Sequence, residues 1–280
     1  MPPHRIGLIS CLDGVNGTAL QYLILQLNAL QGGFSFEFLP CDQADPFIAA
    51  LNRSGRVDRE DIRYQSLEFW ERHKAFQLAY IQTFRTQEQP TGRVVLLTGA
   101  RFHDNFYSMR QGNVSVIALG NWERWMAPPS ILEFALTLTI REAMASVSSK
   151  LRGSVHLGTK GCPCDLTVSL DDTRIKVLSS HLCGFCRESL AVDGLDSLIP
   201  DIEAMLSKSW LGSADDPASP AGVVSSLGHD LFIVKGLKPT TWENIRTALQ
   251  KEGVPQFLTL AQTTIGAVLV ATFLLILGLK

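Results

Sequence analysis

Residues 5–39 read RIGLISCLDGVNGTALQYLILQLNALQGGFSFEFL, and this stretch decides the fold. Its first part, Arg5 to Ser10, is a short apolar run with the length of a buried strand. Thr18 to Leu30 then carries leucine and isoleucine at the spacing of one helical face, and Gly32-Gly33 ends that helix. Phe34 to Leu39 predicts a second strand. A strand, a helix and a strand in this order favour a sheet domain with helices, and we expect the α+β class with an α/β-like sheet.

Further elements follow along the first 210 residues, which we expect to form one soluble domain. Apolar runs predict two more strands, and apolar residues at helical spacing predict three more helices. The strands are Arg93–Thr98 and Val114–Leu119, and the helices are Ser66–Phe84, Ile131–Lys150 and Leu195–Lys208. Ser130 or the prolines before it suit the first turn of the long helix at 131–150.

Composition and charge narrow the class of protein. The 280 residues are 46% hydrophobic and 19% charged, with a formal net charge of −2, so nothing points to nucleic acid as an electrostatic partner. The N-terminus leads into a short apolar run, Ile6 to Ile9, and a signal peptide needs a longer apolar core. We therefore expect the main domain to stay in the cytoplasm.

The C-terminal segment predicts a membrane anchor. Phe257 to Leu279 contains no charged residue over 23 positions, and a bilayer core needs about 20 residues of helix. We expect a single transmembrane helix at 257–280 in the cell inner membrane, with the main domain on the cytoplasmic side and the lipid bilayer as a partner.

Four small residues of this anchor recur every fourth position: Thr259, Thr263, Ala267 and Ala271. A stripe of small side chains lets membrane helices approach closely, so self-association of the anchors is expected. Chance is the alternative, because alanine and threonine are common in such helices.

Two further pieces connect the domain to the anchor. Gly212 to Gly222, GSADDPASPAG, has the composition of a linker, which we place at 211–222. The membrane-proximal segment, 223–256, contains a predicted strand at 230–234 and a predicted helix at 241–250.

Four of the six cysteines fall within 25 residues: Cys162, Cys164, Cys183 and Cys186. In a cytosolic domain such a cluster is more often a metal site than a pair of disulfides. Zinc takes four sulfur or nitrogen ligands in a tetrahedron. The CxxC turn Cys183-Gly-Phe-Cys186 supplies two of them.

The other two ligands come from His156, Cys162 and Cys164. Cys162 and Cys164 point to opposite sides of an extended stretch, so both binding one ion is awkward. We favour His156 and Cys162 with the two CxxC cysteines, and Cys164 is the alternative fourth ligand. A site with four protein ligands is closed, which predicts a structural zinc knuckle at 154–187. A redox pair in the CxxC and plain buried cysteines are the competing interpretations.

Residues 93–190 resemble the archaemetzincins, which are zinc peptidases of the metzincin group. Their pattern is a HExxH helix, then xxGxxHC, a nearby cysteine and a CxxC. Asp165 to Leu182 spans 18 residues, which equals the family's spacing between the second cysteine and the CxxC. The long helix, the cysteines and the CxxC also follow the family's order.

The family's catalytic motif has no counterpart in this sequence. No HExxH occurs, and the nearest string in the expected helix is Arg141-Glu142-Ala-Met-Ala145. A catalytic zinc needs two histidines four residues apart on one helical face and a glutamate as general base. The third histidine is also missing, because Gly161 precedes Cys162. The resemblance therefore implies a scaffold that keeps its structural zinc and has lost its catalytic zinc.

Three functions fit these observations. The favoured one is a non-enzymatic membrane effector of a prokaryotic antiviral defence system, by analogy of architecture. Its zinc-stapled domain would bind a protein partner or a signal, and its transmembrane helices would associate and perturb the membrane. The alternatives are a tail-anchored hydrolase with a site at Glu142 or His103, and a passive membrane adaptor.

Overall fold

The computed structural model describes residues 2–12, 15, 17–53, 55–86, 89–153, 156–157 and 161–228. The predicted transmembrane helix at 257–280 lies outside these residues, as do the predicted strand at 230–234 and the predicted helix at 241–250. Within the described ranges, no helix combines the length and the apolar character needed to cross a membrane.

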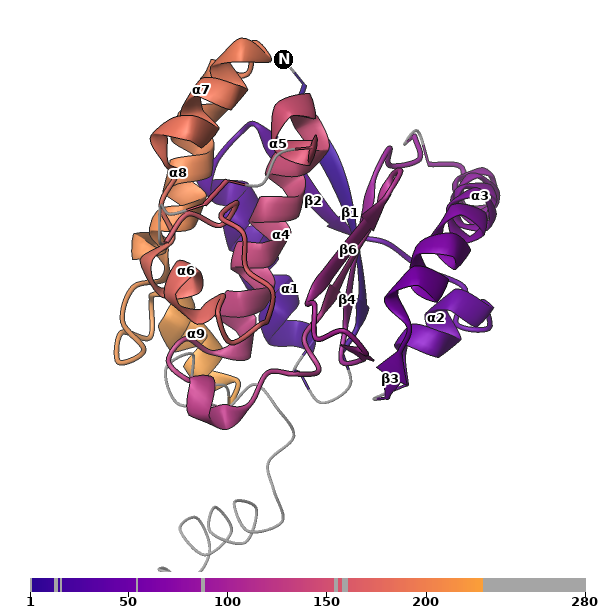
Figure 1. The fold of residues 1–280 in the computed structure, drawn as a ribbon, viewed down its shortest axis with the longest axis horizontal. Coiled ribbons are helices and arrows are strands. Elements are labelled where there is room, and N and C mark those ends of the chain that lie inside the picture. The colour runs from indigo at the N-terminus through magenta and orange to yellow at the C-terminus, as the bar shows by residue number, and fades with distance from the viewer. Residues whose placement is uncertain are drawn as a thin grey trace, which may run out of the picture. The chain divides into compact units, whose positions relative to one another are not determined.

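A mixed five-stranded sheet forms the centre of the fold (Figure 1), with strand order β2-β1-β4-β7-β6. Its strands are β1 His4–Cys11, β2 Phe34–Phe38, β4 Val94–Thr98, β6 Ser108–Gln111 and β7 Val114–Ala118. The first four strands across the sheet are parallel, and β6 pairs antiparallel with β7 at the edge. The four strands predicted within residues 1–210 are confirmed to within one residue at each end, and the α/β-like sheet is confirmed with them.

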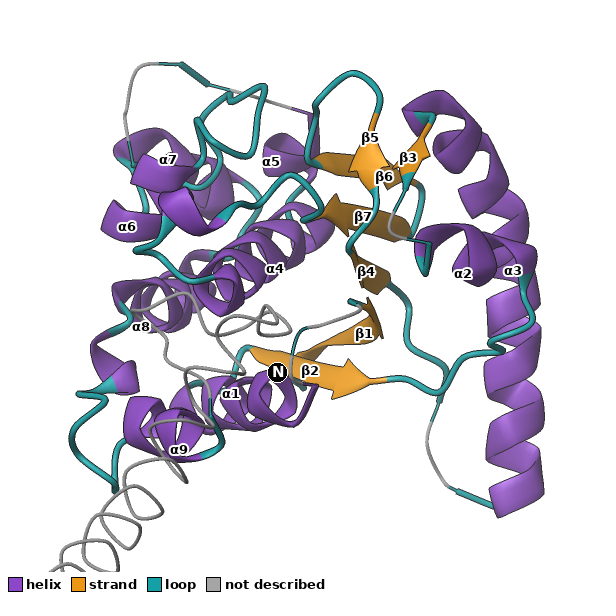
Figure 2. Cartoon of the chain, turned by 90° about the horizontal axis from the view of Figure 1, so that it is seen from below, coloured by secondary structure: helices purple, strands orange, loops and turns teal. Residues whose placement is uncertain are grey.

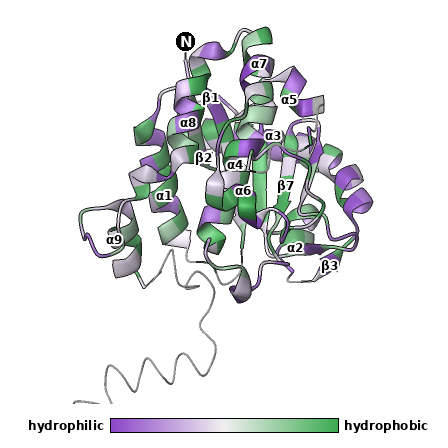
Figure 3. Cartoon of the chain, turned by 60° about the vertical axis from the view of Figure 1, so that its left-hand side comes forward, coloured by the Kyte–Doolittle hydropathy of each residue, from purple (hydrophilic) through white to green (hydrophobic). Residues whose placement is uncertain are grey.

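Helices cover both faces of the sheet (Figures 1 and 2). One face carries α1 (Gly17–Leu30) and α4 (Ile131–Val147), and the other carries α2 (Pro46–Leu51) and α3 (Arg59–Phe84). Every residue of β4 and β7 is buried, as expected for central strands that are covered on both sides. Figure 3 shows the hydrophobic colour of β7 between the helical layers.

Two apolar cores follow from the alternation of side chains along these strands. Val95 and Leu97 of β4 pack with α1 and α4, whereas Val94 and Leu96 pack with α2 and α3. Successive residues of a strand point to opposite faces, so one strand serves both cores.

Shorter elements complete the described chain. They are the paired strands β3 Arg56–Val57 and β5 Arg101–Phe102, the helices α5 Ser149–Gly153, α6 Arg174–Ser179, α7 Gly184–Val192, α8 Ile199–Ser207 and α9 Pro220–Ser226, and the 3-10 turns Arg124–Met126, Asp196–Leu198 and Ser209–Leu211. The helix predicted at 195–208 is thus α8, which begins four residues late because a 3-10 turn precedes it.

The helix α3 begins seven residues before the predicted Ser66. Asp58 is its N-cap, and the carboxylate accepts hydrogen bonds from the backbone N–H groups of Glu60 and Asp61. The first turns of α3 are mostly polar, so apolar spacing could not reveal them.

A capping box starts the long helix α4 where the sequence predicts it. Ser130 Oγ accepts from the Glu133 N–H, and the Glu133 carboxylate accepts from the Ser130 N–H. The helix ends at Val147, three residues before the predicted end, and α5 follows as a separate turn.

The segment 211–222, predicted to be a linker, is part of the folded domain. Leu211 is 3% exposed, and Ala221 of α9 is fully buried. The Ser219 hydroxyl caps α9 by accepting from the Gly222 N–H, and a Cβ at Gly222 would collide with the backbone of Asp216. The small and polar residues that resemble a linker are needed for a tight hydrogen-bonded turn, so the predicted domain boundary at 210 lies too early.

Candidate metal centre

The CxxC turn forms the N-terminus of α7. Cys183 is the N-cap residue with an extended backbone, and Cys186 lies in the first turn. Backbone N–H groups at a helix start have no intrahelical partner, and the helix dipole is positive there, which favours thiolates. Both cysteines are buried. One short turn therefore supplies two buried sulfur ligands for a metal ion.

Four donor atoms converge at this turn. The donor atoms of His156, Cys162, Cys183 and Cys186 all lie within 4.8 Å of one another. The Cys162 and Cys186 sulfurs are 3.6 Å apart, and His156 Nε2 is 3.2 Å from the Cys186 sulfur and 3.4 Å from the Cys183 sulfur. A zinc tetrahedron has edges of about 3.8 Å between sulfurs and about 3.6 Å between sulfur and nitrogen. The observed separations are close to those of a zinc site.

The other ring nitrogen of the histidine is held by a carboxylate. His156 Nδ1 lies 3.1 Å from Asp165 Oδ1, and the backbone N–H of Leu166 donates to the His156 carbonyl over 2.9 Å. Zinc-binding histidines usually donate their second N–H to a carboxylate, which fixes the tautomer and leaves the other nitrogen free to bind metal. The arrangement therefore presents His156 Nε2 to the three sulfurs.

The loop that carries Cys162 depends on a glycine. Gly161 has φ of +125°, a conformation that residues with a side chain rarely adopt. A Cβ at this position would collide with the side chains of Ser179 and His181. Gly161 thus lets the chain turn tightly and place the fully buried Cys162 beside Cys186.

Cys164 lies next to the four donors but is not one of them. Its thiol is within hydrogen-bonding reach of Cys162 and Cys186. The hydrogen bond to Cys162, aided by burial, raises the pKa of Cys164 to about 12, and the same contact lowers the pKa of Cys162. With a metal bound, Cys164 would be placed to act as an S–H donor to the Cys162 thiolate.

The donor set is that of a structural zinc site. Three cysteines and one histidine are suited to zinc, and four protein ligands leave no open coordination position. The predicted ligands are all near one another, and the structure distinguishes the group of four from Cys164. Asp165 was not predicted, although it directly follows Cys164 in the sequence, and a carboxylate beside a metal histidine is a recognisable signal.

Glu142, the expected remnant of a catalytic helix, is engaged in a buried ion-pair network. Arg110 donates to Glu142 Oε2 from Nε at 2.9 Å and from Nη2 at 2.7 Å, and Arg141 donates to Oε1 at 3.0 Å. Burial opposes ionisation, but the two arginines hold the pKa of Glu142 below its usual value. Its carboxylate is thus a charged structural partner of two cations, and Arg110 was not predicted to take part.

His103, the other candidate for acid–base chemistry, lies elsewhere. It is exposed in the turn after β5, and its backbone N–H donates to the Val57 carbonyl. Among the described residues, His103 therefore does not form a common site with Glu142 or with the four metal donors.

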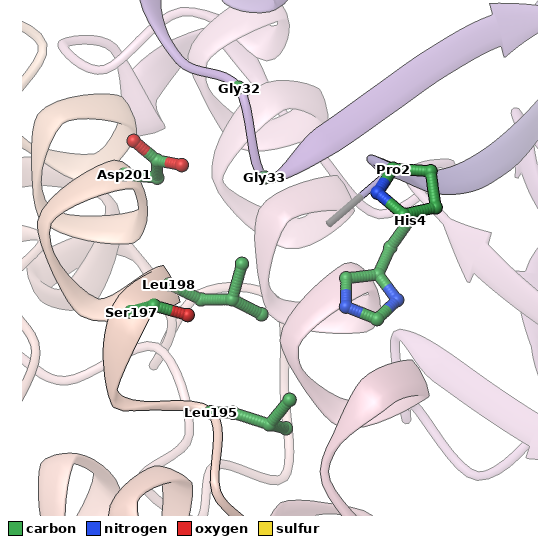
Figure 4. A pocket seen from close by; sticks show the side chains of 8 residues that line it. All are labelled: Pro2, His4, Gly32, Gly33, Leu195, Ser197, Leu198 and Asp201. Carbon is green, nitrogen blue, oxygen red and sulfur yellow. The ribbon is translucent and has the colours of Figure 1, made fainter.

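A separate hollow of about 180 Å³ opens between the start of β2 and the region of α8 (Figure 4). Its lining comes from Pro2, His4, Gly32, Gly33, Leu195, Ser197, Leu198 and Asp201. It contains one imidazole, one carboxylate and no cysteine, so it draws on none of the predicted metal ligands.

Comparison with known proteins gives two similar solved structures, both archaemetzincins. The enzyme from Methanopyrus kandleri has a TM-score of 0.39 and 16% identity, over 68% of this chain and 95% of that one. The enzyme from Archaeoglobus fulgidus, determined in complex with malonate, has a TM-score of 0.39 and 13% identity, over 66% and 99% of the two chains. No family model and no curated protein sequence matches the chain.

Proposed function

We propose that this chain is a non-enzymatic membrane effector, of the kind that serves prokaryotic antiviral defence. In this proposal the zinc-stapled domain binds a partner or a signal, the segment at 257–280 holds the chain in the inner membrane, and association of these segments perturbs the membrane. The defence role rests on an analogy of architecture.

The observation that carries the non-enzymatic part is the state of Glu142. A general base needs a free lone pair directed at a substrate or a water molecule. Both oxygens of Glu142 accept hydrogen bonds from Arg110 or Arg141, and the side chain is 2% exposed. The closed metal centre supports the same conclusion, because a catalytic zinc keeps an open position for water.

The membrane part of the proposal rests on sequence. Phe257 to Leu279 is uncharged and long enough to span a bilayer, and its small residues recur at helical spacing. A single helix makes no pore, so the proposed perturbation requires several copies.

The test is membrane potential in cells that express the full chain with its genomic neighbours. The intact chain is expected to depolarise the membrane when the system is triggered, and a chain truncated after Pro255 is expected not to. Ala267→Leu with Ala271→Leu should reduce depolarisation, because bulky groups keep the helices apart. Ala261→Leu, which lies off the stripe, is the matched control.

Each other outcome would point to another function. If the membrane potential does not change in cells with the intact chain under triggering conditions, the effector proposal is wrong. A stable partner without depolarisation would favour the adaptor. Loss of function on His103→Gln, at an exposed position where stability should be unchanged, would favour the hydrolase.

A further inference from the structure

A pocket of about 200 Å³ lies between the edge strand β6, the helix α4 and the start of α3. Arg59 is the first residue of α3, Arg110 belongs to β6, and Arg141 belongs to α4. Thr167, two residues after the carboxylate that holds the zinc-site histidine, closes another side. Segments far apart in the sequence thus bring three guanidinium groups to one small cavity.

The charge around this pocket is unbalanced. Its three arginines have two carboxylate partners, Glu142 and Asp104, in the described part of the chain. Two more arginines, Arg93 and Arg152, lie near Arg110. Burial and the positive charges of Arg152 and Arg110 lower the pKa of Arg93. The arginines therefore outnumber the carboxylates around this pocket, and Arg141 also interacts with Tyr107 and with the sulfurs of Cys164 and Cys162.

Two of the arginines, Arg59 and Arg141, have N–H groups that make no hydrogen bond among the described residues. Arg59 Nε donates a hydrogen bond to Asp104 Oδ2. The guanidinium carbon of Arg59 lies over the Phe106 ring, 4.3 Å from its centre. Arg141 uses Nη1 for Ser108 and Glu142. Among the described residues, the remaining nitrogens of these two side chains have no hydrogen-bond partner.

Glu142 does not compete for these N–H groups. Its oxygens face Arg110 and Arg141 Nη1 within the ion pairs already described. The hydroxyls of Tyr107 and Thr167 lie 2.8 Å apart in the pocket wall, so one donates to the other, and Lys176 Nζ donates to Thr167 Oγ1. A ligand here meets the guanidinium groups of Arg59 and Arg141, which come from two different helices, α3 and α4.

We propose that this pocket binds a phosphoryl group, either inorganic phosphate or the head of a small phosphomonoester, between Arg59 and Arg141. A tetrahedral oxyanion has oxygens for donors that arrive from several directions, whereas a planar carboxylate is satisfied by one fork. The cavity volume suits a headgroup of this size. The proposal does not depend on a role at the membrane.

The experiment is a titration of the full chain, purified with its zinc in detergent, at constant ionic strength. Inorganic phosphate, glycerol 3-phosphate and acetate are the three probes, and binding is followed by isothermal calorimetry. Saturable binding of phosphate or glycerol 3-phosphate, with acetate at least tenfold weaker, is expected. Tighter binding of glycerol 3-phosphate would identify a phosphomonoester, and equal affinity would identify the free anion.

Arg59→Gln is expected to weaken phosphate binding by about tenfold, because one charge-assisted contact is lost. Arg63→Gln is the matched control. Arg63 lies one turn along the same helix, pairs with Glu60 at 2.8 Å and does not line the pocket. Arg141→Lys, which keeps the charge and removes the fork, should also weaken binding.

Three results would overturn the proposal. The first is no saturable phosphate binding by the wild-type chain. The second is the same affinity in Arg59→Gln, Arg63→Gln and the wild type. The third is acetate binding as tightly as phosphate, which would remove the argument for a tetrahedral group.

Discussion

Replacing Cys164 and Cys186 separately by serine should give opposite results for zinc content. Both side chains are buried and both sulfurs lie in the same cluster, yet only Cys186 belongs to the group of four donors. Cys186 is 3.6 Å from the Cys162 sulfur and 3.2 Å from His156 Nε2, so its sulfur occupies one corner of the tetrahedron. Cys164 lies beside these four donors and is not one of them.

The size of the two effects follows from these roles. Structural zinc sites bind with apparent free energies of about 10–16 kcal/mol, so one of four ligands carries about 3 kcal/mol if they share it evenly. That loss corresponds to a decrease in zinc affinity on the order of 100-fold for Cys186→Ser. Cys164 is not one of the four donors, so Cys164→Ser is expected to change the free energy of zinc binding by about 1 kcal/mol or less.

The assay is competition for zinc between the full chain and a chromophoric chelator, with bound metal counted by mass spectrometry. Wild type and Cys164→Ser should retain one zinc per chain at chelator concentrations that strip Cys186→Ser. Cys41→Ser, a cysteine distant in sequence from the cluster, controls for general thiol effects. If Cys164→Ser loses zinc while His156→Ala keeps it, Cys164 is the fourth ligand and the geometric assignment is refuted.

Three further predictions concern stability of the full chain, measured by urea unfolding. Glu142→Gln should destabilise the fold by about 2–3 kcal/mol, because two arginines lose a buried counter-ion. An unchanged midpoint of urea unfolding would show that the ion-pair network does not stabilise the fold. His73 has its pKa lowered to about 4 by burial, so between pH 6.5 and 4 the unfolded chain binds a proton that the native chain does not. Stability should therefore fall by up to about 3 kcal/mol as pH drops through that window, and His73→Asn should lack this component of the slope. Gly161→Ala should lower stability and zinc retention together, because its φ and the contacts with Ser179 leave no room for a Cβ; normal zinc content would contradict the account of the Cys162 loop.

The parallel strands were predictable because each one is a short apolar run bounded by turn residues. The edge strand β6 was not, since Ser108–Gln111 has a single buried residue, Met109, and an edge strand needs no second apolar face. The segment at 211–222 was predicted to be a linker because its composition fits two kinds of structure. Serine, glycine and proline serve both flexible linkers and tight turns, and only the packing of Ala221 separates the two.

The metal centre could be predicted from the sequence because four cysteines fall within 25 residues, and this spacing can be read without knowledge of the fold. Its supporting contacts were less accessible. The pairing of His156 with Asp165 spans nine positions, but that of Arg110 with Glu142 spans 32 positions and joins a strand to a helix. Charged residues are common on surfaces, so no local pattern marks the few that meet in the interior.

The ion-pair network itself argues that the pocket beside it takes an anion. A buried carboxylate such as Glu142 needs one cationic partner, and Arg110 already provides two N–H donors to one of its oxygens. The second cation, Arg141, has a side chain that is only 17% exposed and shares that carboxylate, and among the described residues its Nε and Nη2 groups have no hydrogen-bond partner. Burying N–H groups is costly unless an acceptor is present. A bound phosphoryl group would supply those acceptors. Thr167, which lines the same pocket, is two residues from Asp165, whose carboxylate contacts the zinc-site histidine.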